Sequence, residues 1–202
     1  KESLFSDVNN IGAYTLLAAR YRTCFGFTEA EVTALLTQAG KLDRLEAVRT
    51  WYNGYLFGGE VIHNPWSVLS YLHRGEELPG PHWLQTSSND LVRDLLERYA
   101  LELTPVFEAL LSGGSVERTL DEDVVLGELH SRSSAIWSLL VFSGYLKAEA
   151  RSRGPLEEAV YRLSIPNLEV RLVYAGTFRR WMEVRLEGRG ASLEKLTTAL
   201  LS

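Results

Sequence analysis

The stretch from Trp51 to Leu72 constrains the fold more than any other part of the sequence. It places Gly58-Gly59 between two short runs of apolar and aromatic residues, and this pair tolerates the positive φ of a two-residue hairpin turn. Asn64 can then cap a helix, and Pro65 suits the first helical position, where its missing N–H costs nothing. The stretch therefore predicts the end of a helix, a β-hairpin and the start of another helix.

Helical periodicity dominates the rest of the first half. Tyr14 to Cys24 is predicted to form a helix that ends at Gly26. Thr28 followed by Glu31 has the capping-box pattern of a second helix. Apolar residues at three-residue steps predict a third helix that reaches Trp51.

The second half combines helices with strand-like runs. Its predicted segments are, in order, a helix over 90–99, a helix from Pro105 to Leu111, an extended acidic segment, a helix from Ser133 or Ser134 that ends at Gly144, two strands over Tyr145–Ala150 and Ala159–Ile165, and a long helix from about Leu168 to Arg185. The sequence therefore predicts a mainly α fold with short β-hairpins (α+β). A helix followed by a hairpin is the order of a winged-helix module.

Length and composition exclude several classes of protein. The chain has 202 residues, of which 46% are hydrophobic, and its longest apolar runs are too short to cross a bilayer. We therefore expect a cytoplasmic protein with no membrane partner. Cys24 is the only cysteine, which excludes an intrachain disulfide, and its apolar neighbours predict a buried thiol. The first residue is Lys1, and the opening K-E-S-L-F-S-D reads like the interior of a longer protein, so a fragment is expected.

Motifs for catalysis and metal binding are sparse. The phosphate-loop pattern G-x-x-x-x-G-K-[ST] is absent, the histidines lack metal-ligand spacing, and no G-x-S-x-G motif occurs. The run Asp121-Glu122-Asp123 could bind a divalent cation, but a carboxylate run on a loop is more often solvated. No catalytic or metal-binding residue is predicted, and a complete P-loop ATPase is excluded.

Several motifs occur in the order found in a known family. They are F-G-F-T-E-A-E-V (25–32), W-Y-N-G-Y-L-F-G (51–58), N-P-W-S-V-L (64–69), W-L-Q-T-S-S-N-D (83–90), S-G-Y-L (143–146) and I-P-N-L-E-V (165–170). Through them the chain closely resembles the bacterial predicted AAA-ATPase-like family, whose members often carry a C-terminal PD-(D/E)XK nuclease-like domain. The positions that match the family's motifs are Trp51, Tyr52, Gly54, Tyr55, Gly58, Ser67, Trp83, Thr86, Asn89, Gly144, Tyr145, Pro166, Asn167 and Glu169.

The resemblance implies a role within a larger protein. Family members have their phosphate loop and acidic Mg²⁺-binding strand upstream of these motifs and the nuclease-like motif downstream of them. This chain would then correspond to a helical lid-like region over 1–115, with a hairpin near 55–62, followed by a winged-helix-like module over 116–202. ATP and Mg²⁺ are implied for the full-length protein only, and its ATPase core and nuclease-like domain are the implied partners. Leu56 stands where the family frequently has a basic residue, which argues against a γ-phosphate sensor there.

The most specific site that the resemblance implies is a contact with a nucleotide. In related ATPases with a helical lid, a proline-containing helix start packs over the adenine, and Asn64, Pro65 and Trp66 have the matching place in the chain order. An exposed aromatic residue at the positive end of a helix would favour such a ligand. The alternative is that the aromatic residues of this stretch only form the hydrophobic core of the lid-like region, namely Trp51, Tyr52, Tyr55, Phe57 and Trp66.

Two other function classes stay open. Arg151, Arg153 and Arg162 lie on or beside the predicted wing hairpin and could contact the phosphates of a nucleic acid. The helix before this hairpin has no basic residue beyond Arg132, which favours a packing or regulatory module over a sequence reader. The third class is an interaction domain whose exposed aromatic residues dock a partner protein. We favour the lid and winged-helix segment, without catalysis of its own.

Overall fold

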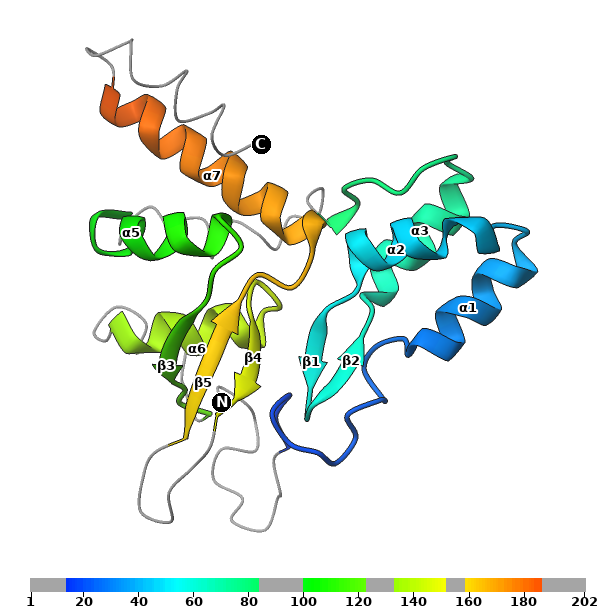
Figure 1. Ribbon diagram of the computed structural model, residues 1–202, viewed down its shortest axis with the longest axis horizontal. Helices are drawn as coiled ribbons and strands as arrows, with labels where there is room; N and C mark the ends of the chain where they lie inside the picture. The colour runs from blue at the N-terminus through cyan, green and yellow to red at the C-terminus, as the bar shows by residue number, and fades with distance from the viewer. Residues whose placement is uncertain (1–13, 84–99, 123–132, 152–158, 187–202) are drawn as a thin grey trace, which may run out of the picture.

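The computed structural model describes residues 14–83, 100–122, 133–151 and 159–186 (Figure 1). The elements are, in chain order, α1 (Glu29–Gln38), the 3₁₀ helix η1 (Leu42–Arg44), α2 (Leu45–Tyr52), β1 (Tyr55–Phe57), β2 (Glu60–Ile62), α3 (Pro65–Arg74), α5 (Ala100–Leu111), β3 (Val116–Thr119), α6 (Ser133–Phe142), β4 (Lys147–Ala150), β5 (Val160–Ser164) and α7 (Leu168–Leu186). The fold is α+β, as predicted. Over the described residues, no helix is both long and apolar enough to cross a membrane.

The capping box predicted at the start of α1 is confirmed. The Glu31 backbone N–H donates to Thr28 Oγ1 at 3.4 Å, and the Thr28 N–H donates to Glu31 Oε2 at 2.8 Å. The helix directs its apolar stripe against α2 and α3, where one buried cluster forms from Val32, Leu36, Val48, Tyr52, Val68 and Tyr71. The first three α-helices thus share a small core of their own.

The predicted helix from Tyr14 to Cys24 is wrong. This segment forms turns, and Tyr21 has a φ of 65°. Its backbone hydrogen bonds go partly to the hairpin rather than along the segment, because the Gly58 N–H donates to the Leu16 carbonyl at 2.7 Å. The prediction of a buried thiol is also wrong, since Cys24 is exposed.

The hairpin β1–β2 and the start of α3 follow the local signals of the sequence. β1 and β2 pair antiparallel with Tyr55 opposite Ile62, and the turn has φ values of 53° at Gly58 and 85° at Gly59. A Cβ at Gly58 would lie 2.3 Å from the Ala18 carbonyl oxygen, so the turn also needs glycine for the close approach of the 14–27 segment.

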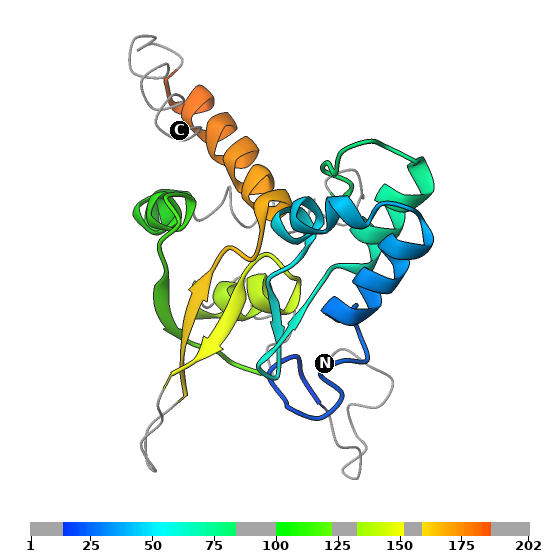
Figure 2. The same ribbon diagram turned by 45° about the vertical axis from the view of Figure 1, so that its right-hand side comes forward.

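The second sheet has the strand order β3-β5-β4 and is antiparallel throughout. α6 covers one of its faces, and α5 and α7 lie beyond one end (Figures 1 and 2). The α6 helix, the strands β4 and β5 and the α7 helix confirm the predicted segments to within about two residues. The expected helix over 90–99 lies outside the described residues.

α5 differs from its prediction because it begins at Ala100 and contains Pro105 in its interior. Proline lacks the backbone N–H that would donate within a helix, so a helix that starts at Pro105 was expected. The helix continues through the proline because it buries Leu103, Phe107, Leu110 and Leu111 in the larger core.

The larger core draws on both halves of the chain. Tyr55 and Ile62 of the hairpin pack with buried residues of α5, α6, the three-stranded sheet and α7. Figures 1 and 2 show the hairpin between the α1–α3 group and the three-stranded sheet. The predicted division between 115 and 116 stays a prediction, and this core contains side chains from both sides of it.

Candidate functional site

The start of α3 holds the three residues predicted to contact a nucleotide. Asn64 caps the helix, because its Oδ1 accepts hydrogen bonds from the N–H groups of Trp66 at 3.0 Å and Ser67 at 3.4 Å. Pro65 occupies the first helical position, as predicted. The Asn64 side-chain oxygen is therefore engaged in capping α3.

Trp66 projects into solvent from this helix start, with 57% of the residue exposed. Asn64 and Pro65 line a cavity of about 360 Å³ beside it, together with Tyr55 and Trp83, whereas Trp66 does not line it. The sequence-predicted trio is thus brought together at one exposed helix N-terminus, next to a hollow of ligand size.

A buried carboxylate joins the start of α3 to the start of α7. Glu169 lies in the first turn of α7 and is 0% exposed. Its Oε2 accepts a hydrogen bond from Ser67 Oγ at 2.6 Å, and its Oε1 accepts from the N–H groups of His82 and Trp83, both at 2.6 Å. Both oxygens are satisfied, as a buried charge requires, so Glu169 acts as a joint between three segments.

Asn167 and Gly54 make a second contact between the same regions. Asn167 Nδ2 donates to the Asn53 carbonyl at 2.9 Å, and its Oδ1 accepts from the Val170 N–H at 3.0 Å, which caps α7. Gly54 has a φ of 96°, and a Cβ there would lie 2.1 Å from the Pro166 carbonyl oxygen. A side chain at Gly54 would therefore separate the two backbones.

The other described motif positions also contribute to packing. Trp83 and Tyr145 have ring centroids 4.8 Å apart, and a Cβ at Gly144 would lie 3.3 Å from Tyr55 Cε1. The Tyr52 hydroxyl donates to the Gly80 carbonyl at 2.8 Å. Burial raises the pKa of Tyr55 to about 12, which keeps its hydroxyl neutral. Thr86 and Asn89 lie outside the described residues.

The wing arginines have acidic neighbours that the sequence reading did not pair with them. Arg162 in β5 stands opposite Glu117 in β3 and Glu149 in β4, and its Nη1 lies 3.6 Å from Glu149 Oε2. Arg151 Nε lies 3.4 Å from Glu117 Oε1. Strand register, which the sequence did not reveal, places each cation beside a carboxylate. Arg153 lies outside the described residues.

Asp121 and Glu122, the described residues of the acidic run 121–123, both form hydrogen bonds with other parts of the chain. The Asp121 N–H donates to Ser138 Oγ at 2.8 Å, and Glu122 Oε2 accepts a hydrogen bond from Thr15 Oγ1. Asp123 falls outside the described part. Within that part, no three histidine, cysteine, aspartate or glutamate side chains gather in the way that a metal site needs.

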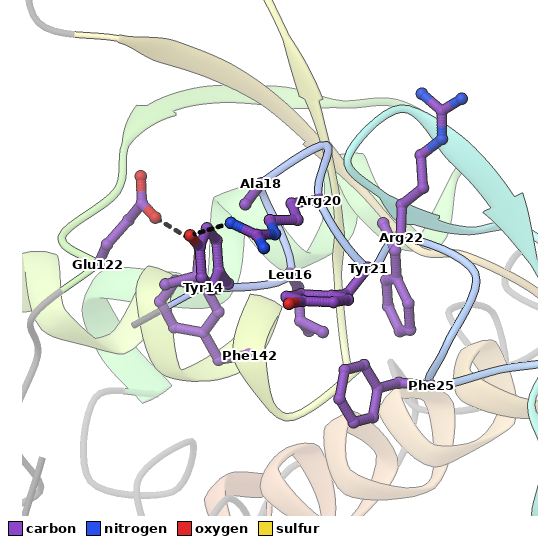
Figure 3. Close-up of a pocket in the computed structure, with 11 residues that line it drawn as sticks. Tyr14, Leu16, Ala18, Arg20, Tyr21, Arg22, Phe25, Glu122 and Phe142 are labelled. Carbon is purple, nitrogen blue, oxygen red and sulfur yellow. Dashed lines mark hydrogen bonds between the residues drawn. The ribbon is translucent and has the colours of Figure 1, made fainter. Parts of the chain in front are cut away.

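One hollow was missed by the sequence reading because it lies on the segment predicted to be helical. It has a volume of about 330 Å³ (Figure 3) and is lined by Tyr14, Leu16, Arg20, Tyr21, Phe25 and Phe57, among others. We call it the aromatic hollow. The density of aromatic and arginine residues over 14–27 was the available signal, but only the turns of this segment bring those residues around one space.

Comparisons with known proteins give one relative and no family assignment. The chain is 33% identical over 173 residues to a protein of Azotobacter chroococcum mcd 1 described as "Uncharacterized protein in vnfD 5'region", and the match covers 85% of this chain. The chain spans only 30% of the length of that curated relative. No protein-family model matches the chain, and no solved structure matches it.

Proposed function

We propose that this chain is the non-catalytic lid and winged-helix segment of an AAA-ATPase-like protein. It contacts nucleotide at the start of α3 and couples an ATPase core to a downstream domain. ATP and Mg²⁺ would be held mainly by that core, which this sequence does not contain. The length of the curated relative is consistent with further domains, since the match covers 30% of it.

The observation that carries the proposal is the hydrogen bond from Ser67, the residue after Trp66, to Glu169 in α7. Trp66 is exposed at a capped helix N-terminus, where the helix dipole favours an anionic ligand. The next residue, Ser67, donates to the buried Glu169 of α7. A ligand that orders the start of α3 would therefore also bias the start of α7 through one hydrogen bond.

The order of elements in the second half supports a winged-helix-like module. α5, β3 and α6 precede the hairpin β4–β5, and β3 adds to the β5 edge of this hairpin to make a three-stranded antiparallel sheet. α6 buries Ile136, Trp137 and Leu140 against the core. A helix buried in this way suits packing and coupling better than insertion into a DNA groove.

The nucleic-acid alternative has weaker support. Arg151 and Arg162, two of its three candidate contacts, each lie within ion-pair distance of a glutamate in the same sheet. Phosphate binding would have to compete with these carboxylates. The partner-docking alternative stays a prediction.

The test is nucleotide binding by the natural gene product that contains this chain. Trp66→Ala is expected to weaken ATP affinity about tenfold, in line with the loss of one base–aromatic stack. Leu69→Ala is the matched control, because Leu69 lies on the same helix and is 48% exposed. A Trp66→Ala protein with lower stability and unchanged ATP affinity would remove the nucleotide contact from the proposal.

A further inference from the structure

The aromatic hollow contains an arginine that is held in place by two tyrosines. The Arg20 guanidinium carbon lies 4.9 Å from the Tyr14 ring centroid and 5.0 Å from that of Tyr21. Arg20 Nη1 also donates to the Tyr14 hydroxyl at 2.7 Å, and the two rings meet edge to face at 5.4 Å. Figure 3 shows the guanidinium beside both labelled rings. The cation is thus pre-positioned before any ligand arrives.

Arg20 differs from its neighbour Arg22 in the acidic residues that surround it. Among the described residues, no acidic side chain lies within ion-pair distance of Arg20, whereas its neighbour Arg22 lies 3.6 Å from Glu60 Oε2. Figure 3 shows Arg22 directed away from the rings. Arg20 is exposed and uses one of its five N–H groups on Tyr14, so the others can bind an anion.

The backbone around the hollow is set in an unfavourable conformation. Tyr21 has a φ of 65°, a left-handed conformation that bulky residues rarely adopt. Strain of this kind persists only where the surrounding structure holds it, and it is concentrated at binding and switch sites. Here it places the Tyr21 ring against the Arg20 guanidinium and leaves the residue 49% exposed.

The walls of the hollow are apolar and aromatic. Leu16, Ala18, Phe57 and Phe142 line it, and Phe25 stands at it with 71% of the residue exposed. A volume of about 330 Å³ lies at the small end of ligand sites. Two other charged residues line it, Arg22, which pairs with Glu60, and Glu122, which accepts a hydrogen bond from Thr15. Arg20 is therefore the lining cation that an anion can reach, and an apolar wall beside it suits a compact ligand with one aromatic body and one negative group.

We propose that the aromatic hollow binds a small aromatic anion, whose ring packs against Leu16, Phe25 and Phe57 and whose carboxylate or phosphate binds the Arg20 guanidinium. The site goes beyond the proposed nucleotide contact, since none of Asn64, Pro65 and Trp66 lines it, although the hollow and the cavity beside Asn64 share Leu16, Phe25, Phe57 and Phe142. A polynucleotide is disfavoured because Arg22 is paired, Glu122 lies at the rim, and the chain has a net charge of −5.

The test uses three probes that share the naphthalene ring system, namely naphthoate, naphthyl phosphate and the uncharged naphthylmethanol. Dissociation constants for the 202-residue chain come from ligand-observed NMR titrations. Both anions are expected to bind about tenfold more tightly than naphthylmethanol, because each gains a charge-assisted hydrogen bond. The ratio of the dissociation constants of naphthoate and naphthyl phosphate identifies which anionic group the site prefers.

Two variants and one control locate the binding. Arg20→Gln is expected to weaken both anions about tenfold and to leave naphthylmethanol unchanged. Ala18→Leu fills the hollow from its wall and is expected to weaken all three probes while Arg20 remains. Arg118→Gln is the matched control, because the Arg118 guanidinium carbon lies 5.0 Å from the Trp137 ring centroid, outside the hollow.

Several results would overturn the proposal. They are the absence of binding by both anions at millimolar concentration, equal affinities for the anions and naphthylmethanol, and equal losses in Arg20→Gln and Arg118→Gln. Wild-type affinity in Ala18→Leu would also overturn it. The melting temperature of each variant, measured alongside, separates a lost site from a lost fold, and Ala18→Leu decides the matter if Arg20→Gln does not fold.

Discussion

Glu169 connects segments that lie at least 86 residues apart in the sequence. Its three hydrogen bonds replace the water that a carboxylate would keep at the surface, and changing one oxygen to an NH₂ group removes one acceptor and the charge that strengthens these bonds. The same residue was visible in the sequence only as a motif position. Its partners Ser67, His82 and Trp83 could not be predicted, because tertiary contacts over such distances leave no local pattern.

Glu169→Gln is expected to destabilise the chain by about 2 kcal/mol, because a neutral amide loses the charge-assisted hydrogen bonds that the carboxylate accepts from Ser67, His82 and Trp83. Urea denaturation of both proteins measures this loss. Glu108→Gln on α5 is the control, since Glu108 is exposed. Equal denaturation midpoints for wild type and Glu169→Gln would contradict the role of this carboxylate as a joint.

His63 gives the fold a dependence on pH. It is 0% exposed, and burial lowers its pKa from the ordinary 6.5, although Glu29 lies close, with Nε2 to Oε2 at 3.5 Å. The unfolded chain therefore takes up a proton near pH 6.5 while the folded chain resists it. Stability contributed by neutral His63 is present above that pH and falls as the pH drops below it.

We expect His63→Gln to lose stability less steeply than wild type as the pH is lowered through 6.5. Denaturation midpoints measured at several pH values on both sides of 6.5 check this. Parallel curves for the two proteins would show that His63 is not protonated differently in the folded and unfolded states.

At the scale of elements, segments with start or stop signals in their own sequence were predicted correctly. Segments that depend on contacts with distant residues were not. The capping box at Thr28, the turn at Gly58-Gly59 and the cap at Asn64 each depend on neighbours within a few residues, and all three are confirmed. The 14–24 segment was predicted as a helix from its periodicity, yet its backbone bonds with the hairpin turn. Hydrophobic periodicity alone does not reveal that a backbone group will form a hydrogen bond with a distant turn.

The Asn64 cap can be tested as an element of α3. Asn64→Ala is expected to cost about 1 kcal/mol, because the N–H groups of Trp66 and Ser67 lose their acceptor. Asn64→Asp keeps an acceptor at the helix N-terminus and should retain most of the stability. If Asn64→Ala and Asn64→Asp have equal denaturation midpoints, the cap does not stabilise α3.

At the scale of the whole molecule, the α+β class was accessible from the sequence, but the arrangement of its parts was not. The hairpin β1–β2 contributes Tyr55 and Ile62 to the larger core, so the first half of the chain is packed into the second. The candidate trio at α3 was found from the order of motifs, whereas the aromatic hollow depends on a segment whose structure was predicted wrongly. Strand register likewise decided that Arg162 lies opposite two glutamates.

The central claim is that nucleotide binding at the start of α3 is transmitted to α7, and hydrogen exchange of the natural gene product measures this most directly. With ATP and Mg²⁺ present, we expect slower amide exchange both in the first turn of α3 and in the first turn of α7. In Ser67→Ala, which removes the hydrogen bond to Glu169, exchange should slow at α3 but no longer at α7. Unchanged exchange at both helix starts in the nucleotide-bound wild type would contradict the account.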